Sequence, residues 1–86
     1  MTINNTTLNK LISKYNAKEW VKPGSHEIRY YVDWKAVTGQ NPQTSSQRLT
    51  KIWFSKNGEL NVEGKIGCVE HITRIIAETV KELEVA

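Results

Sequence analysis

The sequence contains little cysteine, little proline and no long apolar run. Its 86 residues include one cysteine, Cys68, and two prolines. A single cysteine excludes an intramolecular disulfide framework and is compatible with a reducing compartment. No segment approaches the roughly 18 apolar residues that span a bilayer, and residues 1–10 lack a basic start followed by an apolar run. We therefore expect a cytoplasmic protein without membrane contact.

Residue clusters that carry common enzyme and metal chemistry are also missing. His26, Cys68 and His71 are the only thiol or imidazole groups, fewer than the four ligands of a structural zinc site. Cys68 and His71 share a helical face, but no third orienting group accompanies them. The sequence thus predicts no catalytic residue, no metal site and no cofactor, and an enzyme built around Cys68 is the third alternative after two binding functions.

Size and composition are those of one small globular domain. The chain is 38% hydrophobic and 24% charged, which is ordinary for a folded protein. A length of 86 residues suits one domain, predicted over 1–86. The net charge is +3, and it is unevenly distributed: residues 1–66 carry ten Lys and Arg against five acids, whereas residues 67–86 carry two against four. The basic excess therefore belongs to the first helix and the strands.

Apolar spacing predicts a helix at each end of the chain and strands between them. Leu8, Leu11, Ile12 and Tyr15 recur at helical intervals, and a longer stripe of the same period begins at Val69. Alternating residues mark strands, and Asn57-Gly58 is a strong hairpin signal between two of them. The predicted elements are a helix over 6–16, strands over 27–35, 48–56 and 59–66, and a helix over 68–84.

This order predicts an α+β fold, α-β-β-β-α, with a three-stranded antiparallel sheet and two helices on one face. The polar, uncharged stretch 36–47 contains Gly39 and Pro42, and we interpret it as a long loop. Trp20 and Val21 are expected to anchor the connection that precedes the first strand.

The other face of the sheet is then free. Strand alternation places Tyr31 and Trp53 on that face, with Arg29 and Lys51 beside them. Exposed aromatic residues rimmed by polar groups usually mark a contact site. The predicted binding residues are Arg29, Tyr31, Lys51, Trp53, Lys35 and Arg48.

Three interpretations of this face compete. It is covered internally, by the 36–47 loop, by Trp20 or by stacking of Tyr31 on Trp53. Alternatively, it binds a protein partner or a second copy of the chain, because Tyr, Trp and Arg are enriched in binding hot spots. In the third interpretation the same residues, together with Lys35, Arg48 and Lys56, bind single-stranded RNA or DNA, with aromatic rings on bases and cations on phosphates. Asp33, Glu59 and Glu63 disfavour phosphate, so the first hypothesis is a protein-binding adaptor or inhibitor that uses the open sheet face and the 36–47 loop.

Overall fold

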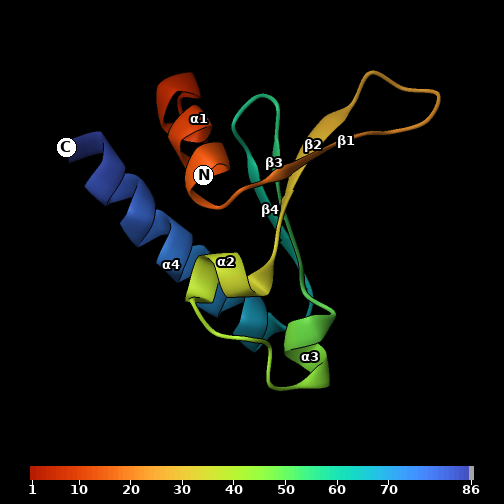
Figure 1. Ribbon diagram of the computed structural model, residues 1–86, viewed down its shortest axis with the longest axis vertical. Helices are drawn as coiled ribbons and strands as arrows, with labels where there is room; N and C mark the ends of the chain where they lie inside the picture. Colours follow the sequence, from red (N-terminus) through yellow and green to blue (C-terminus); the bar gives the residue numbers. More distant parts are fainter. Residues whose placement is uncertain (86) are drawn as a thin grey trace.

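The computed structural model describes residues 1–85, which form a four-stranded antiparallel sheet and four helices (Figure 1). The strands are β1 (Lys18–Val21), β2 (Ile28–Val32), β3 (Lys51–Ser55) and β4 (Leu60–Glu63), and they lie side by side in chain order. The helices are α1 (Asn5–Lys14), α2 (Trp34–Thr38), α3 (Ser45–Arg48) and α4 (Ile66–Val85). The predicted α+β class is confirmed, whereas the expected count of three strands and two helices is wrong.

Helix α1 begins one residue before the predicted range and ends two residues earlier, at Lys14. Its first turn is capped by Asn4, whose side-chain oxygen accepts a hydrogen bond from the Thr7 amide at 2.9 Å. Leu8 and Leu11 are buried, as the spacing predicts. Helix α4 is longer than predicted, and buries Ile72, Ile76 and Val80 along one side.

The missed strand is β1, in the segment interpreted as a connection. Pro23 and Gly24 do not merely end the first helix; they lie in the turn that joins β1 to β2. Trp20 pairs with Arg29, and Val21 with Ile28. With four residues, all of them exposed, β1 has no buried side that could produce a visible alternation of apolar and polar residues.

Residues 36–47 are not one long loop, as expected, because two short helices take up much of this region. The strand predicted over 27–35 ends at Val32, and Trp34 begins α2. Gly39, with a φ of 78°, ends α2 in the left-handed conformation that glycine adopts most readily. Helix α3 begins after Thr44, whose side chain accepts from the Gln47 amide at 3.2 Å. Trp34 is buried, as expected for a residue on the inner face, but it belongs to helix α2 and not to a strand.

The predicted hairpin around Asn57-Gly58 is confirmed, with shorter strands. Those predicted over 48–56 and 59–66 extend over Lys51–Ser55 and Leu60–Glu63, because Arg48 belongs to α3 and Ile66 to α4. The Ile3 amide donates to the Gly58 carbonyl at 2.8 Å, which ties the N-terminal segment to the hairpin turn. Gly58 has a φ of 91°, and a Cβ atom there would overlap the Ile3 carbonyl oxygen.

The hydrophobic core lies between one face of the sheet and helices α1, α2 and α4 (Figure 1). Ile52 and Phe54 of β3 point into it, and each is 1% exposed or less. None of the helices within residues 1–85 covers the other face. Within residues 1–85, no helix is both long and apolar enough to cross a membrane.

Candidate functional site

The open face of the sheet carries a stack of aromatic rings and one guanidinium group. Strand pairing sets Trp20 of β1 opposite Arg29 of β2, and Tyr31 of β2 opposite Trp53 of β3. Directly opposite side chains on one face of an antiparallel sheet are close neighbours. The register therefore brings side chains from three strands into one cluster, which we call the aromatic patch: Trp20, Arg29, Tyr31 and Trp53.

Arg29 is the centre of the aromatic patch. Its guanidinium carbon lies 4.7 Å from the centre of the Trp53 ring and 5.3 Å from that of Trp20. Both distances are within the range of cation–π attraction. Its Nη1 donates to the Tyr31 hydroxyl at 3.0 Å, and its Nε donates to Glu27 Oε1 at 2.7 Å. The guanidinium is thus held by two rings, a hydroxyl and a carboxylate.

The Arg29–Glu27 pair also shifts proton affinities. The hydrogen bond from Arg29 lowers the pKa of the Glu27 carboxyl below its ordinary value of 4.5, and the positive charge of Lys22 acts in the same direction. Reciprocally, the hydrogen bond to Glu27 raises the pKa of the Arg29 guanidinium. Both groups are charged at neutral pH, so Arg29 presents no free cation comparable to that of an unpaired lysine.

The rings of the aromatic patch are covered to different extents. Trp53 is 6% exposed, although no helix lies over it. Tyr31 is half-buried and lies 5.6 Å from Trp53 in a tilted contact, while Trp20 meets Tyr31 edge-on at 6.1 Å. Trp20 remains 38% exposed at the end of the row. Two of the expected forms of internal cover are therefore present: cover by Trp20 and stacking of Tyr31 on Trp53. They leave Trp20 itself partly exposed.

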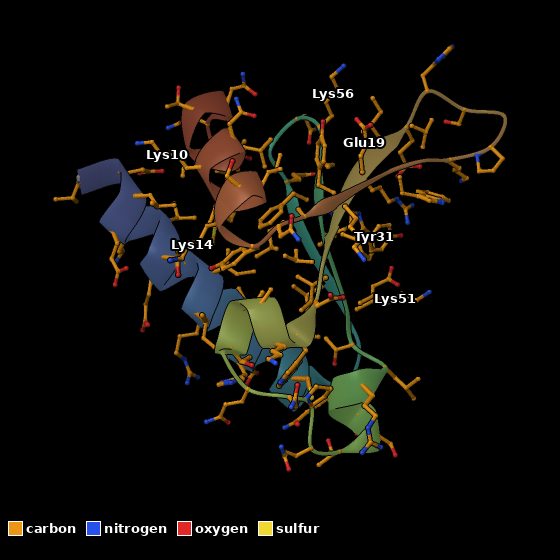
Figure 2. All side chains as sticks on the ribbon, in the orientation of Figure 1. Lys10, Lys14, Glu19, Tyr31, Lys51 and Lys56 are labelled. Atoms are coloured by element: carbon orange, nitrogen blue, oxygen red, sulfur yellow. The ribbon has the colours of Figure 1, made fainter. Side chains whose placement is uncertain are left out.

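Lys51 and Lys18 extend the aromatic patch with positive charge. Lys51 lies two residues before Trp53 on the same face, and Figure 2 shows it beside Tyr31. Lys18 is opposite Tyr31 in β1, where sequence reasoning expected no strand. Both are exposed. Within residues 1–85 the one ion pair is that of Arg29 with Glu27, so neither lysine has a carboxylate partner within 4 Å there.

Lys35 and Arg48 do not lie on the sheet, contrary to their predicted place. They belong to α2 and α3 and line a shallow hollow with Asp33 and Gln47 at the end of the sheet. The predicted strands 27–35 and 48–56 were too long, since they included Lys35 of α2 and Arg48 of α3. Of the predicted binding residues, Arg29, Tyr31, Lys51 and Trp53 are brought together, and Trp20 and Lys18 are the missed members.

Cys68 and His71 lie at the start of α4 and line a second hollow with Trp34, whose ring centre is 5.8 Å from that of His71. Across residues 1–85, no three His, Cys, Asp or Glu side chains gather closely enough to hold a metal ion. Comparison of the chain with protein-family models, with curated proteins and with solved structures found no match. The function is therefore argued from the aromatic patch and its surroundings.

Proposed function

We propose that the chain is a non-enzymatic protein-binding domain, an adaptor or inhibitor, that binds its partner through the open face of the sheet. The binding surface comprises the aromatic patch and the two flanking lysines, Lys18 and Lys51. The observation that carries the proposal is the row Trp20–Arg29–Trp53, built across three strands on a face that no helix covers.

Two properties of this row support protein binding. Tryptophan, tyrosine and arginine are the residues most enriched among those that dominate binding energy at protein interfaces. The row is also ordered before any partner arrives, because its contacts link neighbouring strands. A preformed surface loses less side-chain entropy on binding than a flexible one.

The same geometry makes single-stranded nucleic acid the second candidate. A base needs an accessible ring face, and Trp53 is 6% exposed under Arg29. A phosphate needs an available cation, but Arg29 is already hydrogen-bonded to Glu27. Asn61 and Glu63 of β4 lie opposite Trp53 and Lys51, which adds a negative charge beside the flanking lysine. Lys18, Lys51 and the Trp20 edge still keep the alternative open to test.

Capture of displayed protein fragments from the source genome tests the proposal. Fragments should bind the wild-type domain and should bind Lys51→Glu or Trp20→Ala at least about tenfold more weakly, as for hot-spot residues. Lys56→Glu is the matched control, because Lys56 is an exposed lysine in the β3–β4 turn, away from the patch (Figure 2). Fragments that bind all three variants equally well would place the interface elsewhere and overturn the proposal.

A titration with mixed single-stranded oligonucleotides separates the two candidate functions. Nucleic-acid binding predicts quenching of tryptophan fluorescence that weakens steeply with salt, because each neutralised phosphate releases counterions. It also predicts that Lys51→Glu reduces the quenching more than Lys56→Glu does. The protein-binding proposal predicts no saturable quenching at low or moderate salt.

A further inference from the structure

Strand β1 leaves one edge of the sheet unpaired. It pairs with β2 on one side and is the outermost strand of the sheet. All of its residues, Lys18–Val21, are exposed. Figure 1 shows the β1–β2 hairpin projecting away from the helices, so that no helix covers this edge. An unpaired edge is a template for a further strand.

The register identifies which backbone groups are free. The Lys22 amide donates to the Glu27 carbonyl at 3.0 Å, so Lys22 and Glu27 are a hydrogen-bonded pair. Hydrogen-bonded and non-hydrogen-bonded pairs alternate along an antiparallel ladder. Trp20 and Lys18 therefore direct their backbone groups toward β2. Glu19 and Val21 direct theirs outward, where each presents one donor and one acceptor to an added strand.

Side chains along this edge select what can be added. Lys18, Trp20 and Lys22 lie on the open face of the sheet, whereas Glu19 and Val21 lie on the opposite face. Neither Lys18 nor Lys22 forms an ion pair within residues 1–85, although Lys22 lies near enough to Glu27 to lower its pKa. The edge thus carries one cation on each side of Trp20, which is 38% exposed.

A second copy of the chain fits this edge poorly. Two-fold pairing of Glu19 with Val21 of the other copy places Lys18 opposite Lys22, and pairing Glu19 with itself opposes two carboxylates. Pairing Val21 with itself extends the ladder into Pro23, which has no amide donor. Like charges directly opposite each other destabilise a strand pair. Each self-pairing register therefore carries a penalty.

From this complementarity we infer that the β1 edge binds an extended acidic segment of a protein partner, which adds as a fifth strand beside β1. Carboxylates of the segment lie opposite Lys18 and Lys22, and an apolar side chain lies against Trp20. Backbone hydrogen bonds at Glu19 and Val21 supply affinity, and the charged pairs supply selectivity. An antiparallel segment then follows the order acidic, apolar, apolar, basic, acidic. This edge is distinct from the proposed binding face, with Trp20 common to both.

Titration with a capped peptide, Gly-Glu-Val-Leu-Lys-Glu-Gly, followed by NMR, tests the inference. At millimolar concentration the peptide should shift the amide signals of Lys18–Lys22 and slow hydrogen exchange at Glu19 and Val21. The charge-reversed peptide, Gly-Lys-Val-Leu-Glu-Lys-Gly, should bind about tenfold more weakly, because the three attractive pairs with Lys18, Glu19 and Lys22 become repulsive. Equal affinity for the two peptides, or no exchange protection at Glu19 and Val21, would overturn the inference.

The variant Val21→Pro isolates the role of the backbone. Proline removes the outward amide donor without removing a hydrogen bond to β2, and edge strands tolerate proline in that position. Val21→Thr is the matched control because it keeps the donor. Binding should be lost in Val21→Pro and retained in Val21→Thr, with unchanged tryptophan emission showing that both are folded. A concentration-dependent dimer that Val21→Pro abolishes would instead identify a second copy as the occupant. Lys51→Glu distinguishes this edge from the sheet face. It should weaken binding at the sheet face and leave binding of the peptide to the β1 edge unchanged.

Discussion

The Arg29 guanidinium lies 4.7 Å from the centre of the Trp53 ring and covers it on the side of the sheet that has no helix. Trp53 is therefore as inaccessible as a core residue, 6% exposed, while belonging to a surface cluster. Trp53 therefore supports Arg29 from below, and the accessible ring of the aromatic patch is Trp20, which is 38% exposed beside that guanidinium.

Substitution of Arg29 by lysine should expose Trp53. Lysine keeps the charge but has no planar group that can stack on two rings and hydrogen-bond to Tyr31 at the same time. We expect red-shifted tryptophan emission at neutral pH and a lower urea midpoint for unfolding. Lys51→Arg is the control, because Lys51 is exposed and forms no ion pair within residues 1–85. Emission of Arg29→Lys identical to that of the wild type would contradict the described stack.

Acid titration should report the Arg29–Glu27 pair directly. Because the hydrogen bond from Arg29 holds the Glu27 pKa below 4.5, the contribution of this carboxylate to stability is complete above that pH. It is lost as the pH falls through the folded-state pKa. Carboxyl NMR titration should place the Glu27 midpoint below 4.5 and find it higher in Arg29→Gln. The same midpoint in both proteins would show that Arg29 does not stabilise the ionised carboxylate.

Replacement of Gly58 by alanine should destabilise the fold. The added Cβ overlaps the Ile3 carbonyl oxygen, and the φ of 91° is unfavourable for alanine. Substitutions at such positions cost more than about 1 kcal/mol in the free energy of unfolding. Gly67→Ala in α4 is the control, because its Cβ meets no atom within 4 Å and alanine favours a helix. The midpoint of thermal unfolding should fall in Gly58→Ala and should not fall in Gly67→Ala.

The Tyr15 hydroxyl should be dispensable at neutral pH. It is buried without a hydrogen-bond partner in the described structure, and burial raises its pKa above 10.0. Thr79 partly lowers this pKa, but burial is the larger effect. The Thr79 hydroxyl donates its hydrogen to the Ile75 carbonyl at 2.9 Å, so it does not donate to Tyr15. Tyr15→Phe should change the free energy of unfolding at pH 7 by less than about 1 kcal/mol.

Alkaline unfolding provides the second measurement on Tyr15. A group whose pKa is raised on folding stabilises the protein below its unfolded-state pKa and loses that contribution as the pH rises through the folded-state value. Wild-type stability should therefore fall above pH 10.0 more steeply than that of Tyr15→Phe. Parallel pH profiles would show that folding does not raise the pKa of Tyr15, and a large loss of stability at neutral pH would indicate that the hydroxyl is hydrogen-bonded.

Sequence reasoning predicted the parts of the fold that have a buried side. The stripe of Ile72, Ile76 and Val80 and the Asn57-Gly58 turn each carry a period or a turn signal, and both are confirmed. Strand β1 has neither, since its residues are exposed on both faces. Helix α2 follows β2 after one residue, so the alternation of the strand continued into it and concealed the helix start at Trp34.

The residues of the candidate site could be predicted only where the sequence pattern identified the strands that carry them. Arg29, Tyr31, Lys51 and Trp53 lie in strands that the pattern identified, and they share one face. Trp20 was expected only as a possible cover of this face, because no signal marked β1, the strand that sets it beside Arg29. Strand alternation also gave no indication that Arg29 covers Trp53, because it assigns faces and not the order in which side chains stack.

The central claim is that the open face of the sheet binds protein, and comparison of Lys51→Glu with Lys56→Glu tests it most directly. Affinity for captured partner fragments, measured by titration calorimetry, should fall at least about tenfold in Lys51→Glu and stay at the wild-type value in Lys56→Glu. Equal affinities of the two variants would contradict the claim and move the interface away from Trp20, Arg29 and Trp53.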